Sequence, residues 1–272
     1  MPIPFLKHMS NTLFIGKVYH RFDELPSTND WAAQIIASGK NTDGFAAAKT
    51  KPPEGTVVRA ANQTAGRGQL GSQWHSSAGK NLLLSIILYP TWLEVKAQFY
   101  LSMAVALALR DLAASFVEDS NVQVKWPNDL YLQDKKAAGI LIQNTISGSN
   151  LQNSIIGIGL NVNQLEFSSD LPNASSLALM LGEDIDLEMV ADKLFECMEQ
   201  RYLQLKSGQR AAIKSAYESS LWRIGAPHIF ERSVDNTSFE GTILGVTEAG
   251  LLLLQTSSGQ ESFELKTIRF KT

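Results

Sequence analysis

The stretch that decides the fold is Gly66-Arg67-Gly68-Gln69-Leu70-Gly71, which spells G-x-G-x-x-G, together with residues 72–89 that follow it. In a dinucleotide-binding fold a helix opens at the third glycine, and an acidic residue follows about twenty positions later. Here Gly71 leads into a polar, turn-forming stretch at 72–80 and then into an apolar segment at 81–89 without helical periodicity. No acidic residue lies near the expected offset, so the sequence predicts a strand after the loop and excludes a dinucleotide fold.

The chemistry of this loop suits an anion. Its three glycines permit unusual backbone angles and let peptide N–H groups approach a ligand closely, and Arg67 adds a fork of donors. A phosphate or a transferring adenylate would fit such a loop. A plain glycine-rich surface turn is the alternative.

The segments around the loop predict an α+β fold with one mixed sheet packed against helices. Ser27-x-x-Asp30 fits a capping pattern before the first helix, and Leu101, Val105, Ala108, Leu112 and Phe116 lie on one face of the second. The expected helices cover 29–39, 97–118, 187–206 and 209–220. The expected strands cover 56–61, 82–89, 122–125, 130–132, 137–143 and 154–162, with a turn at Asp134-Lys135 and a polar loop at 164–176.

The pattern changes after Trp222. Short strand-like segments at 228–231, 238–244, 251–255 and 262–265 alternate with turn signals at Asp235-Asn236, Ala249-Gly250 and Ser258-Gly259. The sequence therefore predicts a small β-barrel over 222–272, docked on a larger domain over 1–221.

Composition excludes several classes of protein. The 272 residues carry a formal net charge of -3 and no run of Lys or Arg, so a nucleic-acid binder is not expected. The single cysteine, Cys197, excludes an internal disulfide and a thiol metal cluster, and its helical context predicts an inert buried thiol. No signal peptide is evident and the apolar runs are too short to span a bilayer, so we expect a soluble, cytoplasmic protein.

A second cluster runs from Lys125-Trp126-Pro127-Asn128-Asp129 to Lys136-Ala137-Ala138-Gly139-Ile140. Pro127 interrupts a strand pattern and marks an edge, a bulge or a bend. Lys125 and Lys136 stand in apolar surroundings, where an unpaired ammonium is costly. Two interpretations remain open, namely a cationic clamp for an anion in one cleft, or two strand lysines whose ammonium groups reach water.

A third cluster is Gly157-Ile158-Gly159-Leu160-Asn161. Glycines that alternate with apolar residues in a strand mark a place where another backbone or a ligand approaches closely. Asn161 offers a donor and an acceptor that suit the edge of a purine. Earlier in the chain, Ser27 and Thr28 allow two roles, because either hydroxyl caps a helix or binds a ligand.

The order of these motifs, Ser27-Thr28-Asn29, Gln63 to Gly68, Lys125 to Asp129, Lys136 to Ile140 and Gly157 to Asn163, closely resembles the biotin–protein ligases over about residues 18–270. The resemblance implies a class II synthetase-like ligase domain with an SH3-like barrel. It implies that biotin and Mg-ATP form biotinyl-5′-adenylate, and that a lysine of a biotin carboxyl carrier domain then attacks it and releases AMP.

The resemblance also implies roles for individual residues. The expected catalytic residues are Lys136, Arg67 and Asp129, with Asp129 orienting Lys136 or the incoming amine. The expected biotin-binding residues are Ser27, Thr28, Asn29, Gln63, Gly66, Arg67, Gly68, Gln69, Lys136 and Gly139. The expected ATP- and adenylate-binding residues are Arg67, Trp74, Lys125, Asn128, Lys136 and Asn161. No side chain is assigned to Mg²⁺, and no covalent enzyme intermediate is expected.

Two departures from the family pattern matter. Many members carry arginines at both positions that follow the second loop glycine, where this chain has Gln69 and Leu70, so we expect weaker phosphate contact and looser retention of the adenylate. Some relatives begin with a helix-turn-helix repressor module, for which about twenty residues here leave no room, so operator binding is not expected. A homodimer is compatible with the resemblance. The alternatives are a lipoate or octanoate transferase and a non-catalytic, adenylate-responsive binding protein.

Overall fold

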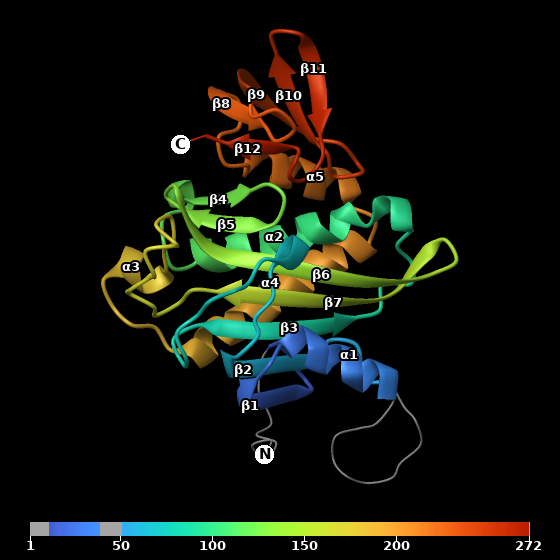
Figure 1. Ribbon diagram of the computed structural model, residues 1–272. Coiled ribbons are helices and arrows are strands. Elements are labelled where there is room, and N and C mark those ends of the chain that lie inside the picture. The colour runs from blue at the N-terminus through green and yellow to red at the C-terminus, as the bar shows by residue number, and fades with distance from the viewer. Residues whose placement is uncertain (1–10, 39–50, 272) are drawn as a thin grey trace.

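The computed structural model describes residues 11–38 and 51–271, and its larger sheet has seven strands in the order β1-β2-β3-β7-β6-β5-β4 (Figure 1). The strands are β1 (Tyr19–Leu25), β2 (Val57–Gln63), β3 (Leu82–Leu88), β4 (Val122–Lys125), β5 (Asp129–Leu132), β6 (Lys135–Ser147) and β7 (Asn150–Leu160). β1 and β2 run parallel, and the other neighbouring strands run antiparallel. The predicted mixed sheet is therefore confirmed.

Helices cover both faces of this sheet, unequally. They are α1 (Thr28–Ser38), α2 (Phe99–Ala114), α3 (Leu177–Leu181), α4 (Leu187–Lys206) and α5 (Arg210–Ser219), with short 3₁₀ turns at Gln69–Gly71, Val95–Ala97 and Asp119–Asn121. The long helices α2 and α4 lie against one face, and α1 crosses part of the other (Figure 1). Because α1 is short, it leaves much of its own face for the site.

The alternation of β7 shows how the two faces differ. Ile156 and Ile158 join the main core on the face of α2 and α4. Ile155 joins a smaller core with residues of α1, so Gly157 and Gly159, which share its side of the strand, face α1 as well. The glycines thus lie on the face that α1 only partly covers.

The start of α1 agrees with the predicted cap. The backbone N–H of Asp30 donates to Ser27 Oγ at 3.4 Å, and the amide of Trp31 donates to the Ser27 carbonyl at 3.1 Å. A serine at this position satisfies one of the helix's unpaired N–H groups. The predicted end of the helix at Gly39 lies outside the described residues.

Several predicted boundaries were wrong. The helix expected over 97–118 is confined to Phe99–Ala114, so Phe116 lies beyond its end, and the Ser115 hydroxyl donates to the Leu112 carbonyl at 2.6 Å there. Both β1 and β12 (Ile268–Phe270) were missed, since β1 is an edge strand whose burial lacks the alternation of a half-buried strand. The hairpin turn falls at Gln133-Asp134, one residue before its predicted place.

The smaller sheet is antiparallel, with five strands in the order β11-β10-β9-β8-β12. Its strands are β8 (Pro227–Arg232), β9 (Ser238–Val246), β10 (Leu252–Thr256), β11 (Gly259–Phe263) and β12. The rings of Phe230, Phe239, Phe263 and Phe270 pack together within it. This arrangement is consistent with the predicted SH3-like barrel.

The two sheets are joined by specific contacts near β4. The Trp126 indole N–H donates to the Gly250 carbonyl at 2.9 Å, and the amide of Trp222 donates to the Val124 carbonyl at 2.8 Å. The Trp222 indole N–H in turn donates to Asp134 at 2.7 Å. The Trp222 ring also packs against Phe270 at the end of β12, with ring centroids 5.6 Å apart. Within residues 11–38 and 51–271, no helix is both long and apolar enough to cross a membrane.

Candidate active site

A cavity of about 630 Å³ opens on the face of the sheet that α1 partly covers. Its wall comes from the start of α1, the glycine loop, the strands β4 to β7 and the C-terminal barrel. A second hollow of about 470 Å³ lies beside it, and the glycine loop lines both.

Most of the predicted site residues converge on this cavity. Those on its wall are Ser27, Thr28, Asn29, Gln63, Arg67, Gly68, Gln69, Trp74, Lys125, Asn128, Asp129, Lys136 and Gly139. They come from segments up to about 110 residues apart in the chain, and the fold brings them to one cavity. Gly66 lines the smaller hollow instead.

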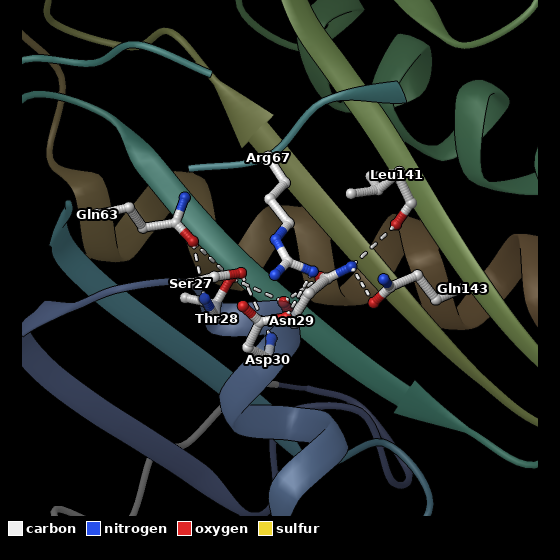
Figure 2. Close-up of polar contacts among 9 residues, drawn as sticks. Ser27, Thr28, Asn29, Asp30, Gln63, Arg67, Leu141 and Gln143 are labelled. Atoms are coloured by element: carbon white, nitrogen blue, oxygen red, sulfur yellow. Dashed lines mark hydrogen bonds and ion pairs between the residues drawn. The ribbon is translucent and has the colours of Figure 1, made fainter. Parts of the chain in front are cut away.

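One end of the cavity is a buried network of neutral polar groups. The Thr28 amide donates to Gln63 Oε1 at 2.7 Å, and Ser85 Oγ lies 2.8 Å from Thr28 Oγ1 and 2.6 Å from Asn29 Oδ1. The Asn29 amide donates to Gln143 Oε1 at 3.0 Å (Figure 2). Neutral donors and acceptors held in this way suit an uncharged ligand group that itself carries both N–H and C=O.

The hydroxyl groups of Ser27 and Thr28 have different hydrogen-bond partners. Ser27 Oγ accepts from the Asp30 amide, which uses a lone pair of the hydroxyl and not its proton. Thr28 Oγ1 lies between Ser85 Oγ and Gln63 Oε1, at 2.8 and 3.2 Å. Thr28 is therefore a fixed member of the network, whereas Ser27 both caps the helix and keeps a proton to donate.

The middle of the cavity is a strip of bare backbone beneath Trp74. A Cβ atom on Gly159 would overlap the indole ring, and one on Gly139 would lie 3.0 Å from Trp74 Cζ3. A Cβ on Gly157 would overlap the side chain of Asn29. The alternating glycines do mark a close approach, but the approaching groups are these two side chains and not the backbone or ligand that was predicted.

Trp74 brings an unusual donor into this region. Its Nε1 is buried and has no hydrogen-bond partner among the residues that the structure describes. Leaving a buried indole N–H unpaired costs about 1–3 kcal/mol, which a ligand acceptor would recover. Lys136 Nζ lies 5.7 Å from the centre of the indole ring, so the donor and the ammonium are neighbours.

Lys136 is held by an ion pair and by its backbone. Its Nζ lies 2.7 Å from Asp129 Oδ1, on the neighbouring strand. Its amide donates to the Asn173 carbonyl at 2.7 Å, and its carbonyl accepts from the Ser175 amide at 2.8 Å. The side chain is 37% exposed, so the ammonium is fixed in place and still open to the cavity.

Lys125 lies among aromatic rings. Its Nζ is 5.0 to 5.3 Å from the ring centres of Tyr131, Trp222 and Phe270, and it donates to the Tyr131 hydroxyl at 2.9 Å. Burial lowers the pKa of the Lys125 ammonium; the nearby positive charge of Lys136 lowers it further, and Asp129 opposes the shift. Since Phe270 belongs to β12, the barrel completes the surroundings of a cavity lysine.

Arg67 and Lys136, both expected to be catalytic, bind different carboxylates. Arg67 Nη1 lies 2.9 Å from Asp30 Oδ1, and Figure 2 shows the arginine reaching from the loop toward the first turn of α1. The charge of Arg67 is therefore directed at α1, and the β4–β6 side of the cavity contributes the ammonium groups of Lys125 and Lys136.

Asn161 is buried next to the Lys136 strand rather than on the cavity wall. Its amide donates to the Ser175 carbonyl at 3.0 Å, because the chain turns away from the sheet at the end of β7. Its Oδ1 is buried and has no hydrogen-bond partner within residues 11–38 and 51–271. The purine contact expected of Asn161 stays a prediction.

Sequence reasoning missed several wall and network residues. Ser85 is fully buried and is the single polar residue in β3, which was a signal that could have identified it. Gln143 has no such signal, because it becomes part of the network only through the register of β6. The barrel residues on the wall, also unforeseen, are Ser233, Leu265, Lys266, Ile268, Arg269 and Phe270.

Comparison with known proteins gives concordant matches. A sequence model of the biotin/lipoate A/B protein ligase family matches residues 36–161. The bifunctional ligase/repressor BirA of Bacillus subtilis is 35% identical over 246 residues, which are 89% of this chain and 70% of that protein. The biotin–[acetyl-CoA-carboxylase] ligase of Paracoccus denitrificans is 31% identical over 209 residues, which are 75% of this chain and 85% of that protein.

A solved structure agrees with the sequence matches. The biotin protein ligase of Aquifex aeolicus in complex with biotin and ATP superposes with a TM-score of 0.72 at 26% sequence identity, covering 94% of this chain and 100% of that one. Its extent includes both the large sheet and the barrel.

Proposed function

The chain belongs to the biotin/lipoate A/B protein ligase family, and from this premise we propose that it is an ATP-dependent biotin–protein ligase acting on the carrier domain of an acyl-CoA carboxylase. The observation that carries the proposal is a single cavity with a neutral polar network at one end and two lysines at the other. Biotin has a neutral ureido ring at one end and a carboxylate at the other, which matches this division.

The reaction has two steps. A carboxylate oxygen of biotin attacks the α-phosphorus of ATP, and pyrophosphate leaves to give biotinyl-5′-adenylate. The neutral ε-amine of a carrier lysine then attacks the acyl carbon, AMP leaves, and the amine loses a proton as the amide forms. Neither step needs an enzyme nucleophile.

We assign the ureido ring to the network at the start of α1. The Ser27 hydroxyl has a proton to donate to the ureido oxygen, and Gln63 and Asn29 are held in place to read the ring nitrogens. Gly68 and Gln69 line the cavity from the glycine loop and would cover the ring, while Gly66 lines the neighbouring hollow. The bare backbone at Gly139 leaves room for the Trp74 ring on the cavity wall. Because the network is already paired within the protein, little ordering is needed on binding.

We assign the biotin carboxylate and the ATP phosphates to the end of the cavity that carries Lys125 and Lys136. Bringing a carboxylate against a phosphate is opposed by repulsion, and fixed cations reduce that repulsion in the transition state. Lys136 is positioned for this by Asp129, and Trp74 Nε1 adds a donor beside it. We assign the nucleotide to Lys125 and Asn128, which lie on the wall toward the barrel. A contact of the purine with Asn161, which lies behind that wall, stays a prediction.

We assign Asp129 a role in each of the two steps. It holds the Lys136 ammonium in place during the first step, and its carboxylate accepts the proton of the incoming amine in the second.

Magnesium enters the proposal with the nucleotide. Among the described residues that line the cavity, Asp129 is the single carboxylate, and it is paired with Lys136. Mg²⁺ in nucleotide sites keeps several waters and relies on substrate phosphates, so a set of protein carboxylates is not required. The ion would supply charge neutralisation at the phosphates.

We draw the domain boundary between residues 221 and 222, with the barrel as a wall of the site rather than a DNA-binding part. A net charge of -3 and the lack of a Lys/Arg run support a ligase without repressor activity. A homodimer remains a proposal that sedimentation velocity tests, and a gel-shift assay with operator DNA tests the lack of repressor activity.

The first step can be tested without a carrier. Purified protein is mixed with biotin and Mg-ATP, and pyrophosphate release and adenylate formation are measured. We expect biotin-dependent adenylate, reduced about 10²–10³-fold in Lys136→Ala. The matched control is Lys135→Ala, which removes an exposed lysine next in the chain and should leave the rate unchanged. Equal rates in both variants would contradict the assignment, and adenylate formed from lipoate instead of biotin would reassign the substrate.

A further inference from the structure

The glycine loop is a small closed hairpin at the mouth of the cavity. Its amides at Gly68 and Trp74 donate to the carbonyls of Ser72 and Gly66 at 2.7 and 3.0 Å. Arg67 pairs with Gln73 across it. The hairpin is therefore closed by its own hydrogen bonds, and its residues line both the main cavity and the smaller hollow.

One ion pair ties this hairpin to the opposite wall. Arg67 Nη1 lies 2.9 Å from Asp30 Oδ1 (Figure 2). Asp30 follows directly on Ser27, Thr28 and Asn29, whose side chains form the neutral end of the cavity. The pair thus links the loop to the turn that carries the neutral polar network of the cavity.

The Asp30 carboxylate points toward the glycine loop and not toward the N-terminus of its own helix. An acidic residue at this helix position commonly turns back to the N-cap amide in a capping box. Here the backbone amide of Asp30 donates to Ser27, while its carboxylate reaches across to the loop. Asp30 therefore serves a contact outside its own helix.

We propose that Asp30 is a positioning residue which, through Arg67, holds the glycine loop closed and so sets how long the adenylate intermediate stays bound. This rests on the proposed function. In this arrangement Arg67 fastens the loop, and the phosphate is left to Lys125, Lys136 and Trp74. Gln69 adds no charge of its own to the loop, so the Asp30–Arg67 pair is its main electrostatic restraint.

The contribution of the Asp30–Arg67 ion pair depends on how far its two side chains are exposed to solvent. The side chains of Arg67 and Asp30 are 54% and 35% exposed, so the pair is screened and its contribution is that of a surface ion pair. The upper end of that contribution, about 1 kcal/mol, corresponds to about fivefold faster dissociation of the adenylate when the pair is removed. The difference should shrink at high salt. The global stability should hardly change.

The test measures dissociation of labelled biotinyl-5′-adenylate from the full chain after a chase with unlabelled adenylate. Asp30→Asn should release it about fivefold faster, Asp30→Glu should restore most of the retention, and the exchanged pair Asp30→Arg with Arg67→Asp should release it more slowly than either single variant. The matched control is Asp23→Asn, an exposed aspartate on β1. An Asp30→Asn rate within twofold of the parent, or an exchanged pair no slower than the single variants, would overturn the proposal.

Hydrogen exchange of the ligand-free protein keeps the two proposals distinguishable. Asp30→Asn should speed exchange of the amides at 66–74 and leave those of α2 unchanged. Unaltered loop exchange counts against the ion pair as a restraint, whatever the substrate. A parent protein that forms no adenylate counts against the proposed function alone, because the exchange measurement needs no ligand.

Discussion

Replacing Gly157 by alanine tests whether the buried network at the start of α1 is what recognises the ligand. Gly157 is buried in β7, and a Cβ atom there would overlap Asn29 Oδ1. Asn29 cannot simply move, because Ser85 Oγ lies 2.6 Å from its Oδ1 and Gln143 Oε1 lies 3.0 Å from its Nδ2. The added methyl group must therefore push Asn29 out of the network.

The expected cost comes from two terms. Overpacking of a well-packed interior costs about 1–3 kcal/mol. A buried donor or acceptor that loses its partner costs about 1–3 kcal/mol as well. If about 2 kcal/mol of this is lost from the binding of biotin, its Kd rises about 30-fold.

Isothermal titration calorimetry of biotin against Gly157→Ala measures this directly. The matched control is Gly241→Ala on β9, where a Cβ would meet its neighbours at 3.4 to 3.5 Å, an ordinary contact distance. Urea unfolding confirms that both variants are folded. The reasoning is refuted if folded Gly157→Ala binds biotin within threefold of the parent, since the network would then have no part in recognition.

Three further predictions concern other parts of the molecule. Glu188→Gln should lower the free energy of unfolding by about 3 kcal/mol in urea titrations, because the buried Arg59 of β2 has Glu188 Oε1 at 2.6 Å as its carboxylate partner. The control is Glu240→Gln at an exposed position. Equal urea midpoints of the two variants would exclude a stabilising role for the Arg59–Glu188 pair. Burial raises the pKa of the Cys197 thiol to about 11, so Ellman's reagent at pH 8 should label it slowly in the native protein and quickly in urea. The free energy of unfolding should fall as the pH rises from about 9 to about 11, because the folded state retains the thiol proton that the unfolded state loses. Rapid labelling of the native protein would contradict both expectations. Gln69→Arg should slow the release of free adenylate measured with hydroxylamine trapping, and an unchanged rate would show that the missing loop charge is immaterial.

The sequence was a good guide where local patterns govern structure. The apolar run at β3, the capped start of α1 and the glycines of β7 each predicted their element or their close contact, since hydrophobic period, capping chemistry and the lack of a Cβ act over a few residues. The motif order pointed to the family because several unusual residues occur together.

What the sequence could not provide depends on long-range register. Ser85 and Gln143 reach Asn29 only because β3, β7 and β6 pair in one particular alignment. The barrel residues, such as Phe270 beside Lys125, meet the cavity only through docking of the two sheets. Asp30 looked like half of a capping box, and its contact with Arg67 depends on where the loop folds.

Transfer of biotin to a carrier can be measured as the intact mass of an apo biotin carrier domain after incubation with the purified protein and Mg-ATP. Biotin and lipoate are supplied in parallel reactions, with Lys136→Ala and its neighbour Lys135→Ala as matched variants. A biotin–protein ligase should add one biotinyl group to the carrier, and we expect this gain to be lost in Lys136→Ala and kept in Lys135→Ala. A gain with lipoate alone, or no gain with either acid, would contradict the proposed function.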